Sequence, residues 1–139
     1  MALTNFKLLT CFTCLLILSE PTLAQAKCLG TVSELKTNNV NERWQETTEN
    51  DGKPLTISIT DGANGLDYSA KKAGQLWLTG NVSVCLSEGA TKIILKNTQA
   101  TSNVPMLARL ALPPTQSAQI VNDRINLGGQ GWAGTFIGQ

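Results

Sequence analysis

The sequence contains no histidine among its 139 residues, and this absence excludes several kinds of chemistry. Ser-His-Asp and Cys-His catalysis, histidine-ligated zinc or haem, and an imidazole pH switch all require a residue that the chain lacks. Charged residues are also scarce, at 15%, and nearly balanced, so the formal net charge is +1. A near-neutral chain has no strong general attraction to nucleic acid or anionic lipid, and we expect no nucleic-acid partner.

Long apolar runs are also absent. The longest uncharged, largely apolar run covers residues 8–18, whereas a helix that spans a bilayer needs about 20 residues. Lys7 precedes this run, and Ala24-Gln25-Ala26 follows it as a small-x-small cleavage site. The pattern predicts a cleaved signal peptide over residues 1–26 and a single domain over residues 27–139. We therefore expect an exported protein, periplasmic or secreted, without a stable membrane span.

Two of the four cysteines, Cys28 and Cys85, lie outside the predicted signal peptide. In an exported chain, two cysteines most simply form one disulfide bond. The alternative is a reactive thiol, but no Cys-x-x-Cys remains after residue 26 and no histidine is available as a base. The sequence therefore predicts a structural disulfide between Cys28 and Cys85.

Turn signals recur mostly every 10 to 15 residues, and the segments between them are rich in Thr, Val and Ile, which favours strands. Residues 55–60 alternate strictly between apolar and hydroxyl side chains, as in a half-buried strand. Residues 75–86 form a longer stretch that could be one strand bent at Gly80. Further strands are expected at residues 91–96, 120–121, 125–127 and 132–137, with a turn at Asn122-Asp123.

One segment, residues 105–112, fits two patterns. Met106, Leu107 and Leu110 fall on one helical face, and Pro105 suits a first helical turn. The apolar residues at alternating positions 106, 108, 110 and 112 equally suit one face of a strand, which we prefer. In total, about eight short strands predict a mainly β domain, either a small antiparallel β-barrel or a β-sandwich.

Trp44 stands out because the residues around it are polar. It is either a lone anchor of an edge strand or part of a partly polar surface or cavity, where Trp is common at recognition sites. Arg43 and Glu46 lie beside it and complete a candidate binding surface. Trp132, in the glycine-rich segment near the end of the chain, is a fourth candidate, although a core position suits an aromatic side chain better.

Catalysis is not expected. A pair of carboxylates could hydrolyse glycosides without histidine, but the acidic residues lie in polar or turn contexts, where nothing favours a raised pKa. We identify no catalytic, cofactor-binding or metal-ligating residue. Charge is uneven along the domain, since residues 27–70 carry four basic and seven acidic groups and residues 71–139 carry six and two. We expect the two parts to neutralise each other across one fold.

The sequence thus predicts an exported, non-enzymatic binding protein. One expectation is that a β-barrel holds a small apolar ligand. The alternative is recognition of a macromolecule, as by an inhibitor or accessory subunit, through an edge strand or the surface around Trp44. A small hydrolase that uses carboxylates is a third, weaker hypothesis.

Overall fold

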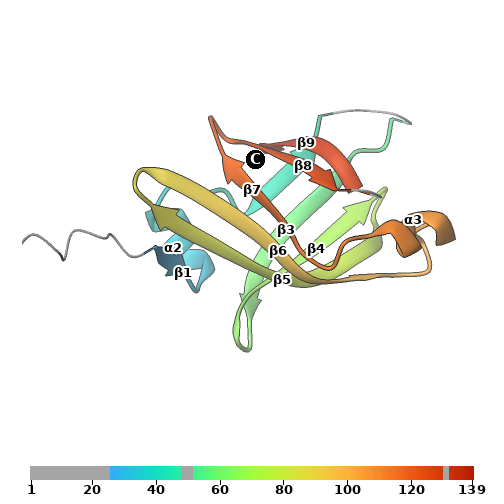
Figure 1. Ribbon diagram of the computed structural model, residues 1–139, viewed down its shortest axis with the longest axis horizontal. Coiled ribbons are helices and arrows are strands. Elements are labelled where there is room, and N and C mark those ends of the chain that lie inside the picture. The colour runs from blue at the N-terminus through green and yellow to red at the C-terminus, as the bar shows by residue number, and fades with distance from the viewer. Residues whose placement is uncertain (1–25, 48–51, 130–131) are drawn as a thin grey trace, which may run out of the picture.

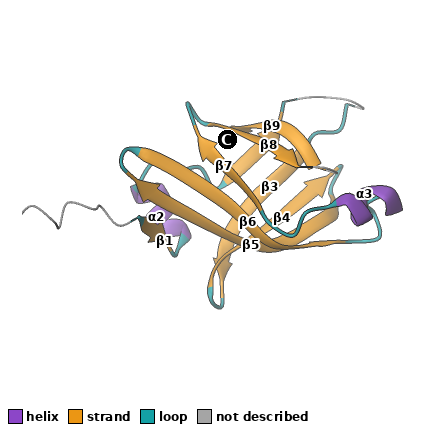
Figure 2. Cartoon of the chain, viewed as in Figure 1, coloured by secondary structure: helices purple, strands orange, loops and turns teal. Residues whose placement is uncertain are grey.

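The computed structural model describes residues 26–47, 52–129 and 132–139, and strands dominate this part of the chain (Figures 1 and 2). It contains nine strands and two short helices. In chain order they are β1 (Lys27–Leu29), α2 (Val32–Thr37), β2 (Arg43–Glu46), β3 (Leu55–Gly62), β4 (Gly65–Lys72), β5 (Gln75–Ser87), β6 (Ala90–Ala100), α3 (Met106–Ala111), β7 (Gln116–Ile120), β8 (Arg124–Gly129) and β9 (Trp132–Gly138).

Eight of these strands form one curved antiparallel sheet in the order β7-β6-β5-β4-β3-β2-β9-β8. The strands at its two ends, β7 and β8, are consecutive in the chain and meet at an isolated bridge between Val121 and Arg124. The sheet therefore curls into a nearly closed barrel, with β7 returning to the side of β8 and β9 (Figure 1). The predicted mainly β fold is confirmed, in its barrel form.

Along the strands that form the barrel wall, side chains alternate between the interior and the outer surface. Every second residue is buried from Leu55 to Ile59 on β3 and from Leu66 to Ala70 on β4, as the alternation in residues 55–60 predicts for β3. The predicted bend at Gly80 is also confirmed: β5 is one strand of 13 residues, and its register against β6 shifts between Thr79 and Asn81. The predicted turn at Asn122-Asp123 joins β7 to β8, and both residues have positive φ angles, 50° and 56°.

The predicted disulfide bond joins Cys28 to Cys85. These residues lie directly opposite each other in the antiparallel pair of β1 and β5. Along β5, the strand β1 continues the line of β4, because β4 pairs up to Val82 and β1 begins its pairing at Val84. The bond therefore holds a strand of three residues that has no other partner strand among the described residues.

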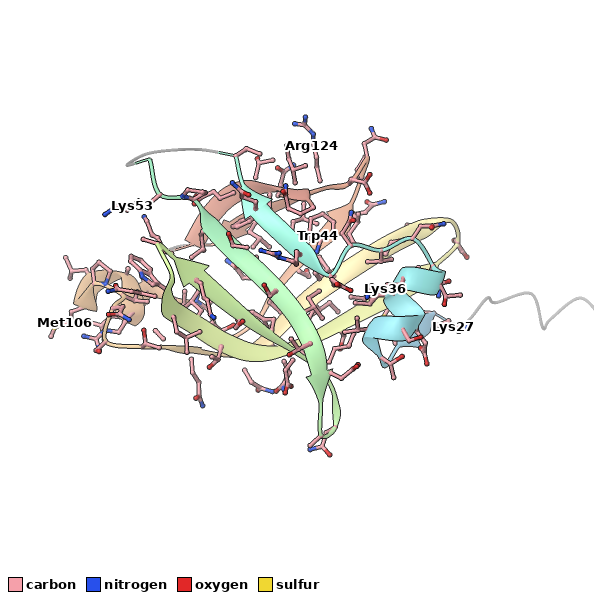
Figure 3. All side chains as sticks on the ribbon, turned by 180° about the vertical axis from the view of Figure 1, so that it is seen from behind. Lys27, Lys36, Trp44, Lys53, Met106 and Arg124 are labelled. Carbon is pink, nitrogen blue, oxygen red and sulfur yellow. A yellow bond between two sulfur atoms is a disulfide. The ribbon has the colours of Figure 1, made fainter. Side chains whose placement is uncertain are left out.

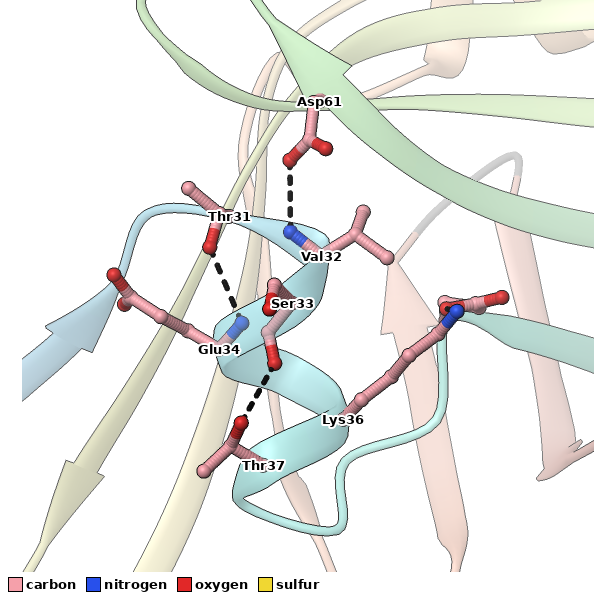
Figure 4. A network of polar contacts seen from close by, with 8 residues as sticks. Thr31, Val32, Ser33, Glu34, Lys36, Thr37 and Asp61 are labelled. Atoms are coloured by element: carbon pink, nitrogen blue, oxygen red, sulfur yellow. Dashed lines mark hydrogen bonds and ion pairs between the residues drawn. The ribbon is translucent and has the colours of Figure 1, made fainter.

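The helix α2 was not expected from the sequence. Thr31 caps it, since its Oγ1 accepts a hydrogen bond from the Glu34 N–H at 3.1 Å (Figure 4). Glu34 Oε2 in turn accepts a hydrogen bond from the Gly30 N–H at 3.0 Å. Asp61 Oδ1, on β3, accepts a further hydrogen bond from the Val32 N–H at 2.8 Å. Leu35 on this helix is fully buried. These contacts fix α2 to the sheet.

The strand expected over residues 105–112 was wrong, because α3 is helical. The strand interpretation assumed that alternating apolar side chains would all face the interior. Instead, Ala108 and Leu112 pack against the core, whereas Met106, Leu107 and Leu110 are exposed.

The core is filled by side chains from most strands of the sheet and by Leu35 from α2. The largest of those with less than 2% exposure are Trp44, Phe136, Leu35, Ile57, Ile93, Leu95, Ile125 and Val84. The predicted signal peptide lies outside the described residues, apart from Ala26. No helix in the described segments is long and apolar enough to cross a membrane.

Candidate functional site

Trp44 is a core residue. Its side chain has 0% exposure, and the indole Nε1 donates a hydrogen bond to the Asn41 carbonyl at 3.1 Å. Its strand, β2, is not an edge strand, because it pairs with β3 on one side and β9 on the other (Figure 3). The expectation that Trp44 anchors an edge strand or lies in a partly polar surface is therefore corrected: the indole is enclosed, and its N–H is satisfied by a backbone carbonyl.

The residues expected beside Trp44 do not gather around it. Arg43 is exposed, as strand alternation requires for a neighbour of a buried residue. Glu46 is half-buried, and its Oε2 accepts a hydrogen bond from the Leu55 N–H at 3.1 Å. The backbone of Trp132 begins β9, but its side chain lies outside the described part of the structure. Among the described side chains, Arg43 and Glu46 therefore form no common binding surface with Trp44.

Arg43 instead lines an open groove of about 470 Å³ at one end of the barrel. The Lys36 ammonium lies 3.4 Å from Glu42 Oε2, and Asn41 Nδ2 donates to Asp123 Oδ1 at 3.3 Å. Charges of both signs thus offset one another within the groove. Other lining residues are Asn39, Val40 and Gln139. The groove is polar and wide open, which suits neither an apolar ligand nor an ion of one sign.

A second feature is the seam where the barrel fails to close. The Val121 N–H donates to the Arg124 carbonyl, and the Arg124 N–H donates to the Val121 carbonyl, each at 3.0 Å. Beyond this pair, β7 and β8 share no bridge among the described residues. We define the seam as the facing edges of β7 and β8, from Gln116 to Ile120 and from Ile125 to Gly128.

Strand geometry identifies the backbone groups that face the seam. In a strand, the N–H and C=O of one residue point to one side and those of the next residue to the other. Since Val121 and Arg124 bond each other, the groups of Ser117 and Gln119 on β7 face the same way as those of Val121. On β8, Asn126 and Gly128 face β7 by the same alternation. The seam-facing groups of these residues therefore have no strand partner within the described ranges of the chain.

Side chains around the seam give it two faces. Ser117 and Gln119 are exposed, whereas Ala118 and Ile120 are half-buried against the core. The turn at Asn122-Asp123 was predicted from sequence, but the seam was not, because strand order determines which edges remain unpaired.

The described residues contain no group of three or more acidic or cysteine side chains that could hold a metal ion. No protein family, curated protein or solved structure matches the chain.

Proposed function

We propose that this chain is a non-enzymatic binding protein of an exported compartment, which recognises a partner protein through the open edge of β7. The observation that carries the proposal is that β7 and β8 end the sheet order and share only the Val121–Arg124 bridge among the described residues. An exposed sheet edge binds an extended peptide by adding it as a further strand, with backbone hydrogen bonds supplying affinity.

Packing of the interior favours this function over the capture of a small apolar ligand. Trp44 and Phe136, the two largest fully buried side chains, have 0% exposure and occupy the space that a ligand would need. An eight-stranded barrel is only wide enough to be filled by its own side chains or to hold one small ligand. Because large inward side chains fill this barrel, binding at its edge is the better use of the fold.

The two faces of β7 provide specificity. A strand added beside β7 would alternate its own side chains between solvent and the interior of the barrel. On the inner side they would contact Ala118 and Ile120, which are already half-buried and apolar. On the outer side they would lie beside Ser117 and Gln119. We therefore expect a partner segment that alternates between small apolar and polar residues.

The proposal is tested with a library of random peptides displayed on phage and selected on the purified protein. Binding of a selected peptide is then measured by calorimetry for the wild type, Gln119→Pro and Gln119→Ala. Proline removes the Gln119 N–H, which faces the seam and is not needed for pairing with β6. We expect Gln119→Pro to weaken binding about tenfold or more, equivalent to about 1.4 kcal/mol.

Gln119→Ala is the matched control, because it removes the side chain and keeps the N–H. It should bind the peptide within about threefold of the wild type, since exposed surface substitutions rarely matter by more than about 0.5 kcal/mol. Thermal unfolding of all three proteins verifies that the barrel is intact. Selection of no peptide, or equal affinity for the proline variant, would contradict binding at this edge.

A further inference from the structure

The helix α3 presents apolar side chains to solvent. Leu107, Leu110 and Met106 are 82%, 79% and 67% exposed, and no residue of this helix is buried. Leu76, near the start of β5, is also exposed. We call these four residues the α3 patch. Single exposed apolar residues are common on proteins, but a group of large ones on one short element is typical of an interaction surface.

The α3 patch is held in place by contacts to the barrel. Val104, just before the helix, is buried, and Ala108 and Leu112 pack against the core. Thr101 Oγ1 and Asn103 Nδ2 donate hydrogen bonds to the Leu76 carbonyl at 2.7 and 2.9 Å. The exposed leucines and methionine are therefore presented by an anchored segment. The helix lies at the end of the molecule away from α2 (Figures 1 and 3).

Positive charge accompanies the α3 patch. Lys71 lies directly opposite Leu76 in the pairing of β4 with β5, and Lys72 Nζ lies 5.1 Å from the centre of the Trp77 ring. Arg109 is exposed on α3 itself. Residues 71–77 and 101–114 contain these three cations and no acidic residue. Although the chain as a whole is nearly neutral, the two segments that form the α3 patch carry only positive charge.

We propose that the α3 patch docks on an anionic lipid bilayer. Apolar side chains on a short helix enter the boundary between headgroups and acyl chains, while nearby lysine and arginine contact the anionic headgroups. The apolar residues and the cations lie on adjacent segments, so one surface can meet both layers. The charge also argues against a second copy of this chain as the occupant, because apposed α3 patches would bring like charges together.

The proposal is tested by sedimentation with vesicles of phosphatidylcholine alone and of phosphatidylcholine mixed equally with phosphatidylglycerol. The protein is the full chain as exported by an expressing cell. We expect binding to the anionic vesicles at least about tenfold tighter than to the neutral ones, and weaker at high salt. Leu107→Gln combined with Leu110→Gln should weaken this binding at least about tenfold, because it removes the inserted apolar groups.

Matched variants distinguish binding through the α3 patch from nonspecific adsorption through other exposed residues. Val121→Ser removes an apolar side chain that is 54% exposed at the turn between β7 and β8, and should leave binding unchanged. Lys71→Gln with Arg109→Gln should lower binding to anionic vesicles, whereas Lys92→Gln should not. Thermal unfolding checks that each variant remains folded, which is expected because all the substituted side chains are exposed.

Failure to bind either kind of vesicle would overturn the proposal, as would binding that the double leucine variant leaves unchanged. Association into dimers that the same variant abolishes, without vesicle binding, would overturn it and assign the α3 patch to a second copy. Gln119→Pro, which tests the edge of β7, should not change vesicle binding. Lipid docking and strand addition can therefore fail independently.

Discussion

Tyr68 and Gly80 lie directly opposite each other on β4 and β5, and the Tyr68 ring fills the space that a side chain at position 80 would occupy. A Cβ atom on Gly80 would lie 2.6 Å from Tyr68 Cε1 and 2.5 Å from the Lys96 carbonyl oxygen of β6. The absent side chain thus allows three strands to approach where β5 bends. This is a position at which only glycine fits without movement of the backbone.

Replacing Gly80 by alanine should lower the free energy of unfolding by about 2 kcal/mol, as overpacking of a filled interior does. Urea unfolding measures this change. Gly30→Ala is the matched control, because a Cβ there would meet nothing within 4 Å, and it should cause no loss. Equal stability of Gly80→Ala and the wild type would contradict the packing described here.

Ionisation of the Tyr68 phenol should make the stability of the fold depend on pH in the alkaline range. Burial raises its pKa above the usual value of 10.0, and a hydrogen bond with Thr98 Oγ1 at 2.5 Å opposes that shift only in part. A raised pKa in the folded state stabilises the protein below pH 10, and this contribution is lost as the pH rises from 10 through the folded-state pKa. Tyr68→Phe should lack this alkaline loss, although it should be about 1 kcal/mol less stable at neutral pH.

Because Tyr68 is the single tyrosine in the sequence, absorbance of the phenolate reports its titration directly. The folded protein should titrate at a higher pH than the protein unfolded in urea. Identical midpoints in the two conditions would contradict the burial of this group.

Loss of the disulfide bond should destabilise the barrel. Its two cysteines are 57 residues apart in the sequence, and closing a loop of that length contributes about 4 kcal/mol in the chain-entropy account. The double variant Cys28→Ala with Cys85→Ala should therefore unfold at a clearly lower urea concentration. A reducing agent should shift the wild type toward the double variant and leave the variant itself unaffected. Unfolding that does not depend on the reducing agent would exclude a structural role for the bond.

Trp44→Ala should lower the free energy of unfolding by about 3–5 kcal/mol, because removing this large, fully buried side chain leaves a cavity in the core. Arg43→Ala, on the neighbouring exposed position of β2, should change stability by no more than about 0.5 kcal/mol. Both values come from urea unfolding. A small effect of Trp44→Ala would restore the interpretation of this residue as a surface anchor.

The elements that follow strand periodicity could be predicted from the sequence. Strict alternation in residues 55–60 reports burial on one face, and it located β3. Helix α2 left a local signal, since Thr31 and Glu34 have the spacing of a capping box. The wrong prediction of a strand at α3 has a different cause. Its apolar residues were expected to be buried, whereas Leu107 and Leu110 are exposed, so the burial pattern could not reveal the helix.

Sequence patterns could predict neither the burial of Trp44 nor the seam between β7 and β8. Trp44 has polar neighbours along the chain, but its apolar neighbours come from other strands, such as Ile57 across the pairing with β3. Likewise, the seam depends on which strands end the sheet, a property of the whole topology. Local periodicity carries no information on either relationship, because both depend on how strands from distant parts of the chain pair in the sheet.

Amide hydrogen exchange of the free protein tests the open seam most directly. The Ser117 and Gln119 amides face the seam, whereas the alternating Ala118 and Ile120 amides face β6. We predict that the Ser117 and Gln119 amides exchange about 100-fold faster than those of Ala118 and Ile120. Amides without a strand partner exchange with no need for the sheet to open first. Equal protection of all four amides would mean that the barrel is closed between β7 and β8, and would contradict recognition by strand addition at this edge.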